Sequence, residues 1–159
     1  MEKNLLKTSS AAANIHLEAV TETNFKACIQ LSPSAGQRRY VLPVVDCLAR
    51  AYIYRDVSET LAVCLDDRPV GFMLLRRDPE SGSLFLWQFL IDQRCQGRGC
   101  GRKAMELIIE RARTDGRSPR MTLTCDEDNE AAKNLYRSLG FTVFSTQEGE
   151  IDMELRFRA

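Results

Sequence analysis

Three glycines fall within six residues of the chain, in the stretch 96-QGRGCG-101. An apolar run at 83–92 precedes this stretch, and an amphipathic segment at 99–113 follows it. A strand, a glycine-rich turn and a helix in this order can bind an anion, because the first amides of a helix lack intrahelical partners and lie at the positive end of its dipole. Glycine leaves those amides open to close approach. We therefore predict that the amides of 96–102 bind a diphosphate, with side-chain donors from Gln96, Arg98 and Arg102.

Two common nucleotide-binding patterns do not fit this stretch. The dinucleotide fingerprint G-x-G-x-x-G is absent, because the glycines occur at every second residue. The P-loop is absent as well, because no Gly-Lys-Ser or Gly-Lys-Thr follows. The hexapeptide by itself therefore leaves open a plain tight turn that binds no ligand.

A second pattern follows about thirty residues later, where Asn129, Ala132, Tyr136 and Gly140 are spaced by three and four residues. This spacing places them on one stripe of a helix. Taken alone, Tyr136 fits a half-buried packing residue better than a catalytic one. The pattern becomes informative only together with the glycine-rich stretch.

The periodicity of the chain predicts a mixed α/β sheet covered by helices. Strands are expected at 14–20, 59–66, 69–77, 83–92, 120–126, 141–146 and 151–157, and helices at 21–31, 99–113 and 128–140. A less regular, mostly helical region is expected at 34–54, with an interruption at Pro43. No internal repeat or linker divides the chain, so we expect one domain at 14–159 after a flexible tail at 1–13.

Composition excludes several classes of function. The 22 basic and 22 acidic residues give a formal net charge of zero, which offers no support for binding to nucleic acid or to an anionic membrane. His16 is the only histidine, so neither a zinc site nor a Ser-His-Asp triad is expected, and no metal is predicted. The six cysteines form no C-x-x-C pair. With no export signal or long apolar span, the chain is expected to be a reduced, cytoplasmic protein.

The two patterns in this order resemble the signature of the GCN5-related N-acetyltransferase (GNAT) superfamily. Its acetyl-CoA motif [QR]-x-x-G-x-[GA] is matched by Gln96, Gly99 and Gly101, and its N-x-x-A-x-x-x-Y-x-x-x-G-F motif is matched without a gap at 129–141. The resemblance covers 14–157. Within the superfamily the two segments are most similar to bacterial polyamine (spermine/spermidine, diamine) acetyltransferases.

The resemblance implies a strongly twisted sheet in which one pair of strands splays apart and holds acetyl-CoA. The strand before the glycine-rich stretch would bulge at Phe89-Leu90-Ile91, and its backbone would pair with the pantetheine amides. Asn129 would also reach the pantetheine, and Lys133 or Asn134 the distal part of CoA. The implied cofactor-binding residues are Phe89, Leu90, Ile91, Gln96, Gly97, Arg98, Gly99, Cys100, Gly101, Arg102, Asn129, Lys133, Asn134 and Tyr136.

The implied activity is acetyl transfer to a primary amine of a small molecule, with a polyamine such as spermidine or spermine as one candidate. The amine would attack the thioester directly, and Tyr136 would protonate the departing CoA thiolate as the catalytic acid. The amide of Leu90 or Ile91 would stabilise the oxyanion. Cys95 and Cys100 then have no covalent role and are interpreted as packing residues.

The sequence departs from some polyamine-acetylating relatives at one place. Where these carry an acidic pair just before the bulge, this chain has Trp87-Gln88. The base must then be another acid or a chain of waters; candidate acids are Asp46, Glu18 and Glu59, each of which also fits an ordinary surface carboxylate.

The predicted acceptor-binding residues are Trp87, Gln88, Tyr40 and Asp46. Trp87 with Tyr40 and Tyr52 would either form an aromatic wall for a cationic or aryl amine, or belong to the core. Two other functions stay open: acetylation of a protein N-terminus or lysine, and a catalytically silent acyl-CoA-binding module. A homodimer is a further possibility, since GNAT proteins are often dimers.

Overall fold

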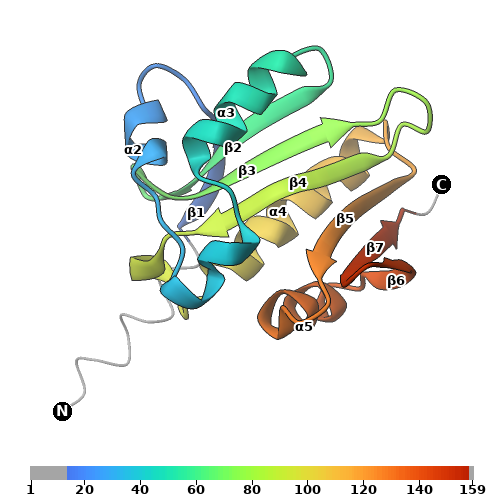
Figure 1. Ribbon diagram of the computed structural model, residues 1–159. Helices are drawn as coiled ribbons and strands as arrows, with labels where there is room; N and C mark the ends of the chain where they lie inside the picture. The colour runs from blue at the N-terminus through green and yellow to red at the C-terminus, as the bar shows by residue number, and fades with distance from the viewer. Residues whose placement is uncertain (1–13, 158–159) are drawn as a thin grey trace.

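The computed structural model describes residues 14–157 and shows one sheet with helices on both faces (Figure 1). The predicted tail at 1–13 lies outside the described residues. The strands are β1 (Ile15–Ala19), β2 (Ser58–Leu65), β3 (Arg68–Arg77), β4 (Leu84–Ile91), β5 (Arg120–Asp126), β6 (Thr142–Gln147) and β7 (Glu150–Arg156). The helices are α2 (Phe25–Ile29), α3 (Val44–Ile53), α4 (Cys100–Asp115) and α5 (Glu130–Ser138), with short 3-10 turns η1 (Ala35–Tyr40) and η2 (Gln93–Cys95).

The predicted α/β fold is confirmed, and most predicted elements differ from the observed ones by one or two residues at each end. The helix predicted at 21–31 is the exception, because α2 begins only at Phe25. The Asn24 side chain accepts a hydrogen bond from the Thr21 amide at 2.9 Å and donates one to the Ala19 carbonyl at 3.0 Å. These bonds hold 21–24 in a turn and delay the start of the helix.

The sheet has the strand order β1-β2-β3-β4-β5-β7-β6. All neighbouring strands are antiparallel except β4 and β5, which are parallel and connected by α4. The interior strand β3 is buried on both faces: Met73 and Leu75 pack in the cluster that includes α4 and α5, and Phe72 and Leu74 pack in the cluster beneath α2 and α3. Within 14–157, every helix is too short or too polar to cross a membrane.

Strand β4 separates from β5 halfway along its length. The two strands pair only from Leu84 opposite Met121 to Leu86 opposite Leu123, although β4 continues to Ile91 and β5 to Asp126. A bulge marks the same place, because Leu75 and Leu74 of β3 face Leu86 and Gln88 and leave Trp87 without a partner. Without the bulge, Leu86 and Leu90 would lie on the same face of the strand. The extra residue reverses which face the following side chains point to, so Leu86 packs toward α4 and Leu90 toward α3.

The predicted position of the bulge, 89–91, is therefore wrong, and the bulge lies at Trp87. Both faces of β4 are covered by helices, so the strand is apolar on both sides and its sequence does not show where the alternation reverses.

Asp92 forms the turn between β4 and the glycine-rich stretch. Its carboxylate is almost fully buried and accepts hydrogen bonds from the Ser32 amide at 3.1 Å, the Arg94 amide at 3.0 Å and Arg94 Nε at 2.8 Å. Burial alone would raise the pKa of this carboxyl, but these hydrogen bonds hold its pKa below the ordinary value. Asp92 thus fixes the direction in which the chain leaves the sheet.

We expect Asp92→Asn to lower the free energy of unfolding by about 1–3 kcal/mol, because the amide cannot accept all three hydrogen bonds. The pKa of Asp92 is depressed in the folded state. Its contribution to the free energy of unfolding is therefore complete above the ordinary pKa near ~4 and is lost as the pH falls through the lower pKa of the folded state. Urea unfolding of the two proteins should therefore differ at pH 7 and converge below about pH 4. Asp56→Asn, an exposed carboxylate, is the control; equal losses in both variants would contradict this role.

Candidate active site

The separation of β4 and β5 opens a pocket of about 630 Å³. Its walls come from the second half of β4, the glycine-rich stretch with the start of α4, the end of β5, one face of α5, and η1. The lining residues are Gln37, Tyr40, Val41, 85–91, Cys95, Gln96, Gly97, 99–102, 123–126, Asn129, Ala131, Ala132, Leu135, Tyr136 and Glu150. The volume suits an elongated small molecule.

Two residues of the glycine-rich stretch have backbone angles that favour glycine. Gly97 and Gly99 have φ angles of 74° and 78°, in the left-handed region that side chains disfavour. Gly99 is the N-cap of α4, and no side chain caps this end of the helix. The first amides of α4 are therefore free to bind an anion in the pocket, which Cys100, Gly101 and Arg102 line.

The side chains around this stretch have different roles. Gln96 Nε2 donates to the Ile91 carbonyl at 3.1 Å and to Gln37 Oε1 at 3.3 Å, so it ties the stretch to β4 and to η1. Arg102 donates to Ser138 Oγ at 2.6 Å and lines the pocket, whereas Arg98 is not among the lining residues.

Tyr136 projects from α5 into the pocket and is 8% exposed. Its ring packs against Phe141 in an edge-on arrangement, with centroids 5.8 Å apart. The Asn129 side chain caps α5 by accepting from the Ala132 amide at 3.3 Å, and Gly140 ends the segment with a φ of 99°. Burial raises the pKa of the Tyr136 phenol, with a smaller contribution from Cys125, so the phenol stays protonated at neutral pH.

Cys95 and Cys100 line the pocket and are buried in the core cluster under α4. Burial raises the pKa of the Cys100 thiol above its ordinary value, which disfavours the nucleophilic thiolate. This environment agrees with the packing role predicted for them.

Lys133 and Asn134 are absent from the lining. The Lys133 ammonium is instead bonded to the Glu127 carbonyl at 2.7 Å and to Glu130 at 2.8 Å. Their contact with distal CoA stays a prediction.

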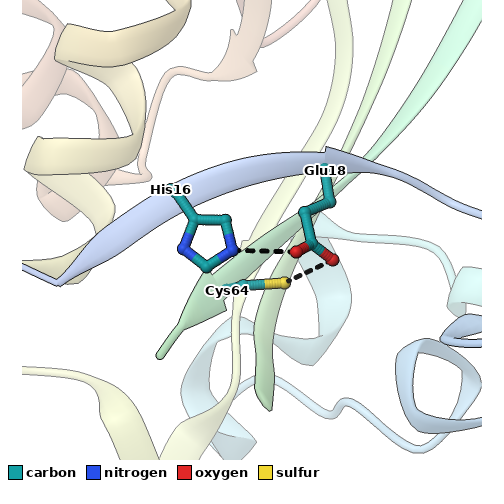
Figure 2. Close-up of side chains that lie close together, drawn as sticks. All are labelled: His16, Glu18 and Cys64. Carbon is teal, nitrogen blue, oxygen red and sulfur yellow. Dashed lines mark hydrogen bonds and ion pairs between the residues drawn. The ribbon is translucent and has the colours of Figure 1, made fainter. Parts of the chain in front are cut away.

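None of the three acids considered as the base lines the pocket. Asp46 is exposed on α3, Glu59 pairs with Arg111 at 2.6 Å, and Glu18 lies on the edge strand β1 beside His16 (Figure 2). The structure instead brings two other acids into the lining, Asp126 and Glu150, which face each other across β5 and β7. Sequence reasoning missed this pair; the position of Asp126 at the carboxyl end of a strand that pairs in parallel was the available signal.

The aromatic wall is only partly as predicted. Trp87 and Tyr40 line the pocket, but Tyr52 is 68% exposed and packs under Arg55. The ring that packs edge-on against Trp87, at 5.3 Å, is that of Tyr54, which does not line the pocket. The reason is helical geometry, since Tyr52 and Tyr54 at the end of α3 point in different directions. Gln88 lines the pocket as well, and its side-chain oxygen accepts from the Leu42 amide at 3.3 Å.

The turn η1, which contributes Gln37 and Tyr40 to the lining, contacts the segments that follow both β4 and β5. The Tyr40 hydroxyl donates to Asp128 at 3.3 Å, and Arg39 pairs with the same carboxylate at 3.2 Å. Together with the Gln37–Gln96 bond, these contacts connect η1 to both sides of the gap between β4 and β5.

The match that decides the family covers most of this site: the model of the acetyltransferase (GNAT) family matches residues 18–141. The chain belongs to the GNAT acetyltransferase family. It is an N-acetyltransferase, with acetyl-CoA as the acetyl donor. The spermine/spermidine N(1)-acetyltransferase of Bacillus subtilis is 30% identical over 148 residues, which cover 87% of this chain and 92% of that protein.

Solved GNAT-like structures have the same fold. A spermidine N-acetyltransferase of Vibrio cholerae in complex with CoA and spermine superposes with a TM-score of 0.74 at 16% identity, covering 91% of this chain and 96% of that one. The ribosomal-protein-S18-alanine N-acetyltransferase of Escherichia coli gives a TM-score of 0.71 at 19% identity, with 91% and 95% covered. At these identities the likeness establishes the fold of this GNAT protein and leaves its acceptor open.

We expect Gly99→Val to weaken acetyl-CoA binding by at least about 30-fold, because a side chain there disturbs the amides that would bind the diphosphate, at about 1.5–3 kcal/mol for each charged hydrogen bond. Isothermal titration calorimetry with acetyl-CoA measures this loss. Gly116→Val is the matched control, since Gly116 ends the same helix with a φ of 65° and lies outside the pocket lining. Both variants should lose similar stability, but equal affinities for acetyl-CoA would contradict a diphosphate site at Gly99.

Proposed function

We propose that this GNAT protein acetylates a primary amine of a small molecule, with a polyamine such as spermidine or spermine as the preferred acceptor. The observation that supports the proposal most directly is the pairing of Asp126 with Glu150 in the wall of the pocket that also contains Tyr136. Two carboxylates in a pocket attract a polycation and disfavour an acceptor with a negative charge. The relatives named for spermine and spermidine acetylation support the same class of acceptor.

The reaction requires a neutral amine, and an alkylammonium with a pKa of ~10.4 is neutral in only about one molecule per thousand near pH 7.4. Asp126 is our candidate for taking up the proton, directly or through water, as nitrogen attacks the thioester carbon. The carbonyl oxygen then carries the developing charge. Backbone amides of β4 beyond Leu86 that point away from β3 have no partner in β5 and would stabilise it.

When the C–S bond breaks, the electron pair stays on the sulfur of CoA. The protonated Tyr136 phenol would donate a hydrogen bond or a proton to that thiolate, and the amide product would leave with the acetyl group. No cysteine is acylated in this sequence of steps.

Acetylation of a protein N-terminus is the second candidate, because the structural neighbours include the alanine acetyltransferase of ribosomal protein S18. An amine panel separates the two: spermidine, spermine, putrescine, an aryl alkylamine and a short peptide with a free N-terminus. We expect free CoA thiol to appear fastest with spermidine or spermine. Faster turnover of the peptide would overturn the polyamine assignment.

For Asp126→Asn we expect kcat/KM to fall by about 10-fold or more with spermidine, the equivalent of about 1.4 kcal/mol for a partly screened charge pair, with a smaller loss for putrescine, which carries one positive charge fewer. Asp152→Asn is the control, since Asp152 follows two residues after Glu150 and lies outside the lining. Equal effects of the two substitutions would mean that the overall electrostatic field of the protein, and not a specific interaction of Asp126 with the acceptor, causes the loss.

Tyr136→Phe keeps the ring and its contact with Phe141 but removes the hydroxyl. We expect turnover to fall by about 10²–10⁴-fold, mainly in kcat, with little change in CoA affinity. Stopped-flow detection of free thiol under single-turnover conditions checks this, and Tyr52→Phe on the exposed end of α3 is the control. If the chemical step of Tyr136→Phe is as fast as in the wild type, the tyrosine has only a packing role.

A further inference from the structure

A histidine, a glutamate and a cysteine meet on the edge of the sheet, away from the acetyl-CoA pocket (Figure 2). His16 and Glu18 belong to the edge strand β1, and Cys64 belongs to its neighbour β2. His16 lies directly opposite Cys64, and Glu18 is two residues further along, so all three side chains lie on the face that carries α2 and α3. The proposed acetyl transfer uses none of them.

The three side chains already point their donor atoms at one another. His16 Nε2 is 2.9 Å from one Glu18 oxygen, the Cys64 sulfur is 3.6 Å from the other, and all three donor atoms lie within 4.8 Å of one another. We propose that His16, Glu18 and Cys64 bind a divalent metal ion of the zinc type, with the fourth position open to water.

The distances fit a tetrahedral ion after a small movement. With metal–ligand bonds of about 2.0–2.3 Å, neighbouring donors of a tetrahedral zinc site are about 3.3–3.7 Å apart. The sulfur–oxygen separation of 3.6 Å is already in that range. His16 Nε2 contacts the other carboxylate oxygen, Oε1, at 2.9 Å, so the imidazole and the carboxylate have to rotate to bring the nitrogen to the same range from the ligating Oε2. That movement is available because the side chains of His16 and Glu18 are 45% and 49% exposed.

The donor types also select the metal. Imidazole nitrogen, thiolate sulfur and carboxylate oxygen together suit zinc, whereas calcium and magnesium prefer oxygen alone. Glu18 borders a surface pocket that Asn24, Asp67 and Arg68 also line, which provides a route for the ion and a water ligand.

The thiol of Cys64 is protonated in the protein without metal. Burial raises the pKa of Cys64 to about 12, with Glu18 adding to the shift and smaller contributions from Cys28 of α2 and from Asp67. An incoming divalent ion must therefore displace this proton, which makes binding weaker at low pH. The bound ion would join the edge strand β1 to β2, and it would stabilise the fold by mass action.

The test uses the whole chain, freed of metal by a chelator, with Zn²⁺ and Co²⁺ as probes. Competition with a chromophoric chelator should give one Zn²⁺ per chain, and Co²⁺ should produce a thiolate-to-metal charge-transfer absorption. Cys64→Ala should abolish that absorption. His16→Ala and Glu18→Gln should each weaken Zn²⁺ binding by more than about 100-fold, since even outer-shell partners of a metal are worth 10–100-fold.

Cys47→Ala is the matched control, because Cys47 is another fully buried thiol of the same core cluster and has no place in the group. It should keep both the absorption and the affinity. Should Cys64→Ala fail to fold, His16→Ala and Glu18→Gln, at two half-exposed positions of the edge strand, still decide the question. Absence of stoichiometric Zn²⁺ binding, or equal binding by the wild type and these variants, would overturn the proposal.

Discussion

The structure depends on one interruption of backbone hydrogen bonding, the point at which β4 leaves β5. Beyond Leu86 and Leu123 the two strands no longer pair, and their facing amides and carbonyls line a pocket instead. Unpaired polar backbone groups in such a pocket are costly unless a ligand or water pairs with them. A cofactor with amide groups along its length, such as the pantetheine of acetyl-CoA, can take the place of the missing strand.

The rest of the fold keeps this gap open and aligned. The bulge at Trp87 turns the strand, and the crossover helix α4 brings its free N-terminal amides to the end of the gap. On the opposite side, α5 directs Tyr136 toward the same space. The turn η1 bonds to Gln96 on one side and to Asp128 on the other, so one segment connects the two sides of the gap.

A net charge of zero conceals an uneven distribution of charge around the pocket. Asp126 and Glu150 form an acidic wall at the ends of β5 and β7. Behind Trp87, Arg50 and Arg76 lie over the indole ring at 5.3 and 5.7 Å, and the buried Arg76 Nε has no hydrogen-bond partner within the described part of the chain. Under the proposed function, this distribution of charge would draw a cationic acceptor toward β5 and away from the tryptophan.

Local interactions let the sequence by itself determine a large part of this protein. The glycine-rich start of α4 and the helical stripe that carries Tyr136 depend on neighbours within a few residues, and the sequence predicted both. The tertiary structure alone decided the position of the bulge, the pairing of Asp126 with Glu150 and the replacement of Tyr52 by Tyr54 beside Trp87. The tertiary structure also decided that His16 and Glu18 of β1 lie beside Cys64 of β2. Each of these depends on strand register or on how a helix seats on the sheet, and such pairings between distant residues leave no mark in local periodicity.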